Sequence, residues 1–336
     1  MGKWTSIWRE EGPQVAFMRR FAPARTAVQE VISLDNQLTP QQIGEFTRQG
    51  FLVLGTPSIP PSELQWCQDV LMRLIREGKG RDEGRYFDLI AREGGTEGTS
   101  PQVLKPSLYA AELRRFSYRE KGLAIAKQLI GPNAALAGDV AIFKPSYKGG
   151  ATPWHQDEAF REPNFEYQEI SIWIALTDTT RENGPMQYIP GSHRLGILPH
   201  RLQGGSKEAN SIECYEGFDE KSAVVCPIPA GAMIIHHHRT VHGALENKTN
   251  SERLAYVLTY STPIELRKEY REFPWLKNLR TSVLERRKLS LRRGGIFREL
   301  IRVMRSDRAV TRIAFVAFAL RRLNQLRHLF KHKSRT

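Results

Sequence analysis

The apolar positions of the chain follow a helical period before residue 131 and alternate with polar positions after it. The first part predicts three helices: from Thr39 to Gly50, from residues 60–62 to Gly78, and over residues 111–130. At the first of these, Thr39 and Gln42 form the pattern of a capping box. The apolar residues 51–54 predict a short buried strand, and the Gly- and charge-rich residues 79–106 predict a loop over the mouth of a site.

Alternation is clearest over residues 168–177, where the two faces differ in composition. One face carries Ile170, Ile172, Ile174 and Leu176, and the other carries Ser171, Trp173 and Ala175. Further strands are predicted over residues 135–143, 223–228, 232–235 and 253–260. Helices followed by a run of short antiparallel strands predict a mainly β protein with flanking helices (α+β), built on a jelly-roll barrel that can carry a metal site in its mouth.

The composition fits a protein with a real core and no membrane span. The chain has 336 residues and is 40% hydrophobic, and its length suits one barrel domain with extensions. Its three cysteines form no C-x-x-C pair, which argues against a disulfide scaffold and fits a reducing compartment. No apolar run approaches the ~18 residues of a membrane span, and the N-terminus lacks the apolar stretch of a secretory signal. A cytoplasmic location is therefore predicted.

The net charge of +14 is concentrated at the C-terminus. Residues 265–336 hold 21 of the 50 lysine and arginine residues and six of the 36 acidic ones, which leaves 29 basic and 30 acidic residues elsewhere. This extension is predicted to be helical, with an amphipathic stretch over residues 296–304 and an apolar run over residues 313–320. Two roles for this extension stay open: peripheral contact with an anionic membrane, and ordinary packing on the barrel. Few aromatic residues and the lack of a base-reading motif argue against nucleic acid as a partner.

The candidate metal ligands are His155, Asp157 and His242. His155 and Asp157 are two positions apart, so on an extended segment their side chains point to the same side. His242, from a distant part of the chain, supplies the third ligand. Two histidines and one carboxylate on one side of a metal, with open positions opposite, are the ligand set of non-haem Fe(II) oxygenases. The open positions can take O2 and a chelating 2-oxoacid.

Arg253 and Trp173 are the candidate residues for that co-substrate. The far carboxylate of a 2-oxoacid needs a fixed cation, and a guanidinium is the best bidentate partner. Arg253 follows His242 by eleven positions, on the next predicted strand, and can reach into the same barrel. Trp173 lies on the face opposite to the isoleucines and is expected to line the pocket.

The other histidines are interpreted as structural. Alternation places His236 and His238 on one face and His237 on the other, which predicts a strand that leads into the site with one histidine packed nearby. A second, histidine-only metal site is less well supported because no carboxylate accompanies the three. His193 and His200 lie in or near turns and are predicted to be structural or solvated.

A series of short motifs runs in a fixed order along residues 38–261. They are Phe143-Lys144-Pro145, Trp154-His155-Gln156-Asp157, Trp173-Ile174-Ala175-Leu176, Glu182-Asn183-Gly184-Pro185-Met186, Ile189-Pro190-Gly191-Ser192-His193 and His242-Gly243, followed by Asn247 and Arg253. In this order and spacing they resemble the phytanoyl-CoA dioxygenase (PhyH-like) family of Fe(II)/2-oxoglutarate-dependent oxygenases.

The resemblance implies a double-stranded β-helix core, of jelly-roll or cupin-like type, over a dioxygenase domain of residues 38–263. Residues 1–37 then form an N-terminal extension and residues 264–336 a basic helical C-terminal extension. The implied iron ligands are His155, Asp157 and His242, and the implied co-substrates are 2-oxoglutarate and O2.

The resemblance also assigns residues to the co-substrate. It implies that Arg253 anchors the distal carboxylate of 2-oxoglutarate, and that Trp173, Gln156 and Lys105 match positions near it. One position departs from the family pattern: Ala244 stands where a serine hydroxyl often helps to hold the same carboxylate. The affinity for 2-oxoglutarate is therefore in question.

The leading hypothesis is an Fe(II)/2-oxoglutarate-dependent dioxygenase that hydroxylates an unactivated C–H bond of a small-molecule or lipid-like substrate and releases succinate and CO2. Related halogenases lack the carboxylate ligand, so Asp157 favours hydroxylation over halogenation. The alternative is a catalytically spent oxygenase fold that acts as a membrane-surface or scaffold protein through its basic tail. The sequence defines neither the primary substrate nor the oligomeric state.

Overall fold

The computed structural model describes residues 37–90, 98–207, 209–283, 285–286 and 288–289. Both stretches singled out in the basic extension, residues 296–304 and 313–320, lie outside the described residues, so membrane contact through them stays a prediction. In the described part of the chain, no helix combines the length and apolarity needed to cross a membrane.

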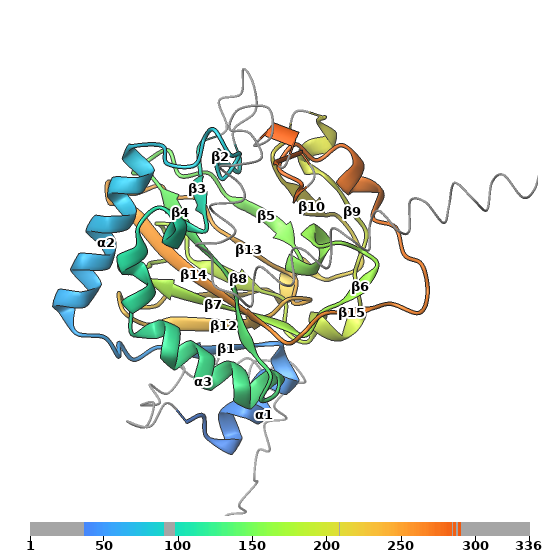
Figure 1. The fold of residues 1–336 in the computed structure, drawn as a ribbon, viewed down its shortest axis with the longest axis horizontal. Coiled ribbons are helices and arrows are strands. Elements are labelled where there is room, and N and C mark those ends of the chain that lie inside the picture. Colours follow the sequence, from blue (N-terminus) through green and yellow to red (C-terminus); the bar gives the residue numbers. More distant parts are fainter. Residues whose placement is uncertain (1–36, 91–97, 208, 284, 287, 290–336) are drawn as a thin grey trace, which may run out of the picture.

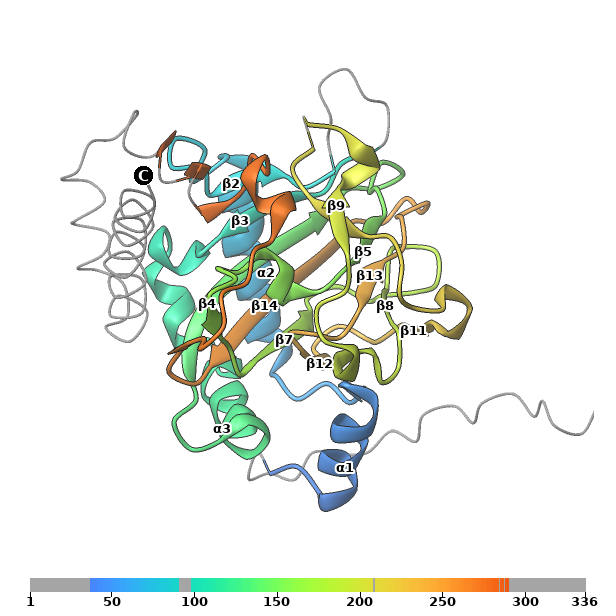
Figure 2. The ribbon, with the colours of Figure 1, turned by 90° about the vertical axis from the view of Figure 1, so that its right-hand side faces the viewer.

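Two antiparallel sheets face each other and form the double-stranded β-helix, as predicted (Figures 1 and 2). The larger sheet has the strand order β1 (Phe51–Leu54), β12 (Met233–His237), β7 (Glu169–Ala175), β14 (Arg253–Ser261), β4 (Ala135–Lys144), β3 (Pro101–Leu104) and β2 (Tyr86–Asp88). The smaller sheet has the order β11 (Val224–Cys226), β8 (Met186–Tyr188), β13 (His242–Ala244) and β5 (Thr152–His155). Two strand pairs lie outside these sheets, β9 (His200–Leu202) with β10 (Ile212–Cys214) and β6 (Phe165–Glu166) with β15 (Glu265–Leu266).

The sheets are accompanied by the helices α1 (Pro40–Gln49), α2 (Pro61–Arg76) and α3 (Tyr118–Ile130). The predicted capping box at the start of α1 is present, since the Thr39 hydroxyl accepts from Gln42 N and the Gln42 side chain accepts from Thr39 N. Gly50 ends α1 with φ 80°, a left-handed conformation that favours glycine. Helices α2 and α3 lie against the outer side of the larger sheet (Figure 1).

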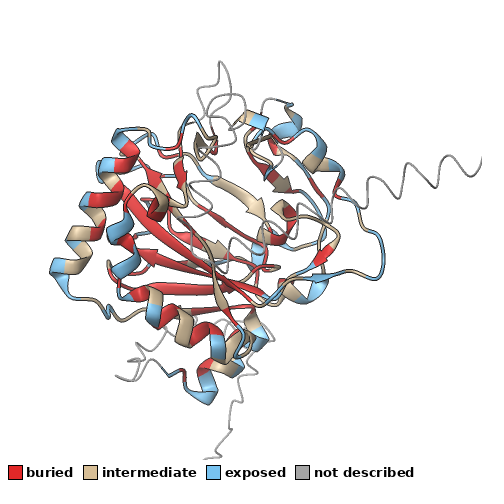
Figure 3. Cartoon of the chain, viewed as in Figure 1, coloured by how far each residue is buried: buried red, intermediate tan, exposed pale blue. Residues whose placement is uncertain are grey.

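The two faces of β7 pack against different parts of the protein, which confirms the predicted difference between them. The isoleucine face packs into the core between the larger sheet and the helices, where it meets Leu71 and Leu74 of α2 and Ile125 of α3. The opposite face carries Trp173 into a second core between the two sheets, which Tyr188 also lines. Figure 3 shows β7, β12 and β14 of the larger sheet buried almost throughout, so both faces of these three strands are covered. The interior of the barrel next to Trp173 is therefore where the predicted metal site is expected.

Two segments differ from the sequence prediction. Residues 79–106, predicted as a loop, contain β2 and β3, which extend the larger sheet beyond β4. In strands of three and four residues the alternation is too short to distinguish a strand from a loop. Whether such residues form a strand depends on their pairing with a distant strand. The predicted helix over residues 111–130 is divided: η2 (Ala111–Arg115) is a 3-10 helix, and α3 begins only at Tyr118.

Beyond Ser261 the chain returns across the open end of the barrel. Strand β15 pairs with β6, and the 3-10 helix η7 (Pro274–Lys277) follows. The indole of Trp275 donates to the Ala159 carbonyl over 2.9 Å, and Leu279 is fully buried against Ala159 and Ile212. The first part of the predicted basic extension thus packs on the barrel, while the boundary at residue 263 stays a prediction.

Candidate active site

The three predicted metal ligands come together at the inner end of the smaller sheet. His155 closes β5 and lies opposite His242, the first residue of β13, and Asp157 begins the 3-10 helix η3 (Asp157–Phe160). One nitrogen or oxygen of each side chain lies within 4.8 Å of the others. The Nε2 atoms of both histidines lie 3.7 Å from Asp157 Oδ1. This donor set and spacing suit one divalent ion that is held from one side.

Backbone carbonyls fix the orientation of both histidine rings. Nδ1 of His155 lies 2.8 Å from the Pro153 carbonyl, and Nδ1 of His242 lies 2.8 Å from the Thr240 carbonyl. A carbonyl can only accept, so each Nδ1 donates its proton and each Nε2 keeps a lone pair for the metal. Burial lowers the pKa of both imidazoles. Neutral histidines with Nε2 turned inward are the form that a metal binds.

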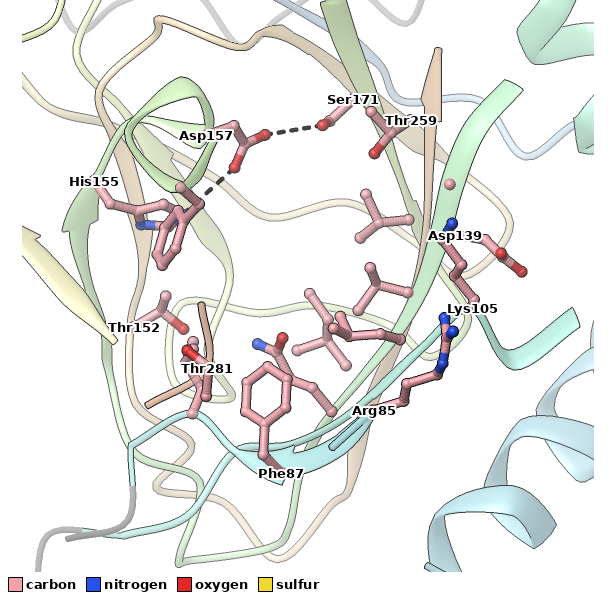
Figure 4. Close-up of a pocket in the computed structure, with 18 of the residues that line it drawn as sticks. Arg85, Phe87, Lys105, Asp139, Thr152, His155, Asp157, Ser171, Thr259 and Thr281 are labelled. Carbon is pink, nitrogen blue, oxygen red and sulfur yellow. Dashed lines mark hydrogen bonds and ion pairs between the residues drawn. The ribbon is translucent and has the colours of Figure 1, made fainter. Parts of the chain in front are cut away.

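Asp157 is held by two further side chains. Its Oδ2 accepts from Ser171 Oγ over 2.9 Å, as Figure 4 shows, and lies 3.2 Å from His236 Nε2. Burial raises the pKa of Asp157, but the opposing effects of His242 and of the His236 hydrogen bond prevail and hold it well below its usual range. The carboxylate is therefore ionised and its Oδ1 faces the two imidazoles.

The histidine cluster behaves as the alternation predicts, with one member at the site. His236 points to Asp157, whereas the ring of His237 lies on the other face, 5.5 Å from that of His193. His238 Nε2 lies 2.9 Å from the carboxylate of Glu158. The sequence indicated a neighbouring histidine but did not show that it contacts a metal ligand.

Glu158 is the centre of a buried ion cluster next to Asp157. It is fully buried and lies 2.6 Å from Arg239 Nε and 2.6 Å from Arg271 Nη2. Burial raises the pKa of Glu158, but hydrogen bonds from His238 and Arg239 lower it further than burial raises it. The cluster fixes the backbone that carries the carboxylate ligand. The sequence does not predict this cluster, because Arg271 comes from a segment more than a hundred positions away.

Arg253 carries unsatisfied hydrogen-bonding capacity inside the barrel. It is 1% exposed, and its Nε and Nη1 are buried without a hydrogen-bond partner among the described residues. Its guanidinium carbon lies 5.4 Å from the centre of the Trp173 ring. Burial lowers the pKa of Arg253 to about 9, so it stays charged near pH 7. A buried guanidinium is costly unless it is paired, so these nitrogens fit the distal carboxylate of 2-oxoglutarate.

A cavity of about 480 Å³ joins these groups. The three ligands, Arg253 and Trp173 all line it, and so does Ala244, which adds a methyl group where the family pattern often has a hydroxyl. Figure 4 shows His155 and Asp157 on one side of this cavity and Lys105 on the opposite side. The cavity can therefore hold the metal, the co-substrate and part of a further molecule.

The side chain of Gln156 points away from this cavity into the protein. It is fully buried, donates to the carbonyls of Gly196 (2.7 Å) and Arg239 (2.6 Å), and accepts from Leu198 N over 2.8 Å. Its backbone N–H donates to Nε2 of His200, which is buried and structural. These contacts position the turn between the two ligands, and contact of Gln156 with 2-oxoglutarate stays a prediction.

The fold and the site are those of the non-haem iron, 2-oxoglutarate-dependent oxygenases. The model of the phytanoyl-CoA dioxygenase (PhyH) family matches residues 46–255, more than half of the chain, so the chain belongs to this family, as its motifs predicted. Fe(II) is the metal of this family, and 2-oxoglutarate is its co-substrate, in accord with the triad of His155, Asp157 and His242.

Two curated relatives and one solved structure illustrate the similarity. A probable alpha-ketoglutarate-dependent hypophosphite dioxygenase of Stutzerimonas stutzeri is 28% identical over 182 residues, 53% of this chain and 63% of that protein. L-proline trans-4-hydroxylase of Streptomyces griseoviridis is 27% identical over 157 residues, 41% of this chain and 59% of that protein. The crystal structure of EvdO2 from Micromonospora carbonacea var. aurantiaca complexed with 2-oxoglutarate is 28% identical, with a TM-score of 0.61 over 73% of this chain and 98% of that chain. The chain thus spans less than two thirds of the length of these curated relatives.

Proposed function

We propose that this chain is an Fe(II)- and 2-oxoglutarate-dependent dioxygenase that hydroxylates an unactivated C–H bond of a small-molecule or lipid-like substrate. The products from the co-substrate are succinate and CO2. The observation that carries the proposal is that Arg253, with Nε and Nη1 unpartnered among the described residues, lines the same cavity as the three ligands. A metal site and an anion site that share one cavity are what a chelating dicarboxylate requires.

Each residue has a separate task. When bound, iron with 2-oxoglutarate supplies the oxidising chemistry by which one atom of O2 enters succinate and the other the substrate. His155, Asp157 and His242 hold the metal from one side, so that its remaining positions face the cavity. Arg253 orients 2-oxoglutarate through its far carboxylate. Trp173 lies beside the guanidinium and excludes water from this ion pair.

Two observations support hydroxylation over halogenation. The first is Asp157, whose carboxylate lies with the two histidines and would occupy the position at a bound metal that a halide needs. The second is the similarity to L-proline trans-4-hydroxylase. The relative named as a hypophosphite dioxygenase acts by its name on a different substrate, so the similarity supports the type of reaction and does not identify the substrate.

The proposal is tested by succinate formation from 2-oxoglutarate with the purified full chain, Fe(II) and O2, first without a primary substrate and then with cell extract added. We expect succinate that depends on Fe(II) and is lost in Asp157→Ala. The matched control is Asp219→Ala, which removes an exposed carboxylate that caps a surface 3-10 helix. Undiminished turnover in Asp157→Ala would contradict the assigned ligand.

A further inference from the structure

Four basic side chains line the cavity in addition to Arg253: Arg85, Lys105, Arg161 and Arg286. They come from four separate segments, the last of them in the part of the chain beyond β15. Figure 4 shows Arg85 and Lys105 next to each other, on the side of the cavity opposite His155 and Asp157. None of the chemistry proposed above uses these four side chains.

The sheet places Lys105 away from both the metal and Arg253. The backbone N–H of Lys105 donates to the Asp139 carbonyl on β4, just beyond the end of β3. Asp157 accepts a hydrogen bond from Ser171 on β7. Strand β7 lies three strands from β3 in the larger sheet, which is a separation of roughly 14 Å across the strands. Arg253 pairs with Lys144, which lies five residues from Asp139 on β4. The backbones of Arg253 and Lys105 are therefore also separated by roughly 16 Å along the strand direction.

Asp139, whose charge favours the cationic form of Lys105, is shared with several other donors. Asp139 already accepts from Arg119 Nη2 at 2.8 Å, from the Tyr256 hydroxyl at 2.7 Å and from the Ser107 hydroxyl at 3.1 Å. Among the described residues, no hydrogen bond or ion pair involves Lys105 Nζ. Burial, and then the charge of Arg85, lower the pKa of Lys105 to about 8. A half-buried cation next to other cations is stabilised when an anion joins it.

The cavity that holds this group and the metal site is lined in large part by apolar side chains, beside polar ones such as Gln102, Thr152 and Thr259. Side chains that line it include Phe87, Leu104, Leu108, Val140 and Ile142. Leu279 and Val283 line the same cavity from the segment beyond β15. A molecule that bridges the two ends therefore needs a charged group at one end and an uncharged carbon segment at the other.

We propose that Lys105 and Arg85 form a binding site for a carboxylate or phosphate group of the primary substrate, whose apolar segment extends across the cavity to the metal. This inference rests on the proposed function, because the metal defines the reacting end. It adds the substrate class: an amphipathic anion. It also gives Lys105 a role that differs from the contact with 2-oxoglutarate implied by the family resemblance.

The test uses the full chain loaded with Fe(II) and 2-oxoglutarate under anaerobic conditions, and calorimetric titration with heptanoate, hexyl phosphate and 1-heptanol. We expect both anions to bind at least about tenfold more tightly than the alcohol, and Lys105→Met to weaken anion binding at least about tenfold. Tighter binding of hexyl phosphate or of heptanoate identifies the anionic group. The control Lys127→Met, on an exposed position of α3, is expected to bind as the wild type does.

Three outcomes would overturn the inference. The first is equal affinity for the anions and the alcohol. The second is anion binding that is undiminished in both Lys105→Met and Arg85→Met. The third is a loss of 2-oxoglutarate affinity in Lys105→Met as large as the loss of heptanoate affinity, which would assign Lys105 to the co-substrate. Thermal unfolding confirms that each variant is folded. In all three outcomes the wild-type protein still binds 2-oxoglutarate. If the proposed function itself is wrong, the wild-type protein does not bind 2-oxoglutarate, so the two failures can be distinguished.

Discussion

His236 Nε2 lies 3.2 Å from the Asp157 oxygen that also accepts from Ser171, so the carboxylate ligand is held on its outer side. The other oxygen, Oδ1, is left to face His155 and His242. A carboxylate that is fixed in this way loses little freedom when a metal binds. His236 is thus a positioning residue for the metal site, through Asp157.

Removing this contact is predicted to weaken metal binding without abolishing it. His236→Phe keeps a ring but loses the hydrogen bond, and we expect a roughly 10- to 100-fold weaker affinity for Fe(II), measured by anaerobic titration. His237→Phe, which changes the next residue on the opposite face, is the matched control and is expected to leave the affinity within a few-fold. Equal losses in both variants would show that the effect is not specific to the contact with Asp157.

Arg253→Met is predicted to separate folding from co-substrate binding. Nε and Nη1 of Arg253 have no hydrogen-bond partner among the described residues, so the variant loses no hydrogen bond there, and we expect its unfolding temperature without ligand to equal or exceed that of the wild type. The stabilisation that 2-oxoglutarate gives the wild type is expected to be lost, because the distal carboxylate has no bidentate partner. Thermal unfolding of both proteins with and without 2-oxoglutarate checks this, and equal stabilisation of both would contradict it.

Binding of heptanoate is predicted to depend on pH through Lys105. Its pKa of about 8 makes it a cation below that pH and neutral above it, so affinity is expected to fall as the pH rises from 7 to 9. A simple carboxylate is fully ionised over this range and adds no change of its own. The other charged or titratable groups that line the same cavity are Glu83, Arg85, Asp139, His155, Asp157, Arg161, His236, His242, Arg253 and Arg286. Calorimetry across this range should show no such decline in Lys105→Met; an identical decline there would assign the titration to another group.

Gly44, in the middle of α1, and Gly50, at its C-terminal end, are predicted to respond in opposite directions to replacement by alanine. A Cβ at Gly50 would lie 2.6 Å from the Thr240 hydroxyl and closer still to His193, and φ is 80°, so Gly50→Ala is expected to cost about 1–2 kcal/mol or more. Gly44 lies in the exposed middle of the helix with nothing within 4 Å, so Gly44→Ala is expected to stabilise the fold by about 1 kcal/mol. Urea unfolding of both variants measures the two effects, and a neutral Gly50→Ala would contradict the close packing at the helix end.

The sequence predicts features that depend on local spacing. The two faces of β7, the capping box of α1 and the His155–Asp157 pair follow from residues within a few positions of one another. Arg253 was also found, because it opens a strand with a clear period, whereas His242 lies on a strand of three residues and was found through the ligand set and the order of the motifs.

Features that depend on contacts between distant segments were not predicted. Arg271 reaches Glu158 from 113 positions away, and β3 owes its strand pairing to β4. Neither contact leaves a local pattern, because hydrogen bonds and ion pairs across the fold are set by the tertiary arrangement. For the same reason, the contribution of Leu279 and Arg286, in the basic extension, to the lining of the cavity was not predicted.

The most direct test of the central claim is an anaerobic crystal structure of the full chain with Fe(II) and 2-oxoglutarate, with the metal located by anomalous scattering. We predict one ion bound by Nε2 of His155, Nε2 of His242 and Oδ1 of Asp157, with the distal carboxylate of 2-oxoglutarate on Arg253. An ion bound elsewhere, or a 2-oxoglutarate whose distal carboxylate binds at Lys105 instead of Arg253, would contradict the account.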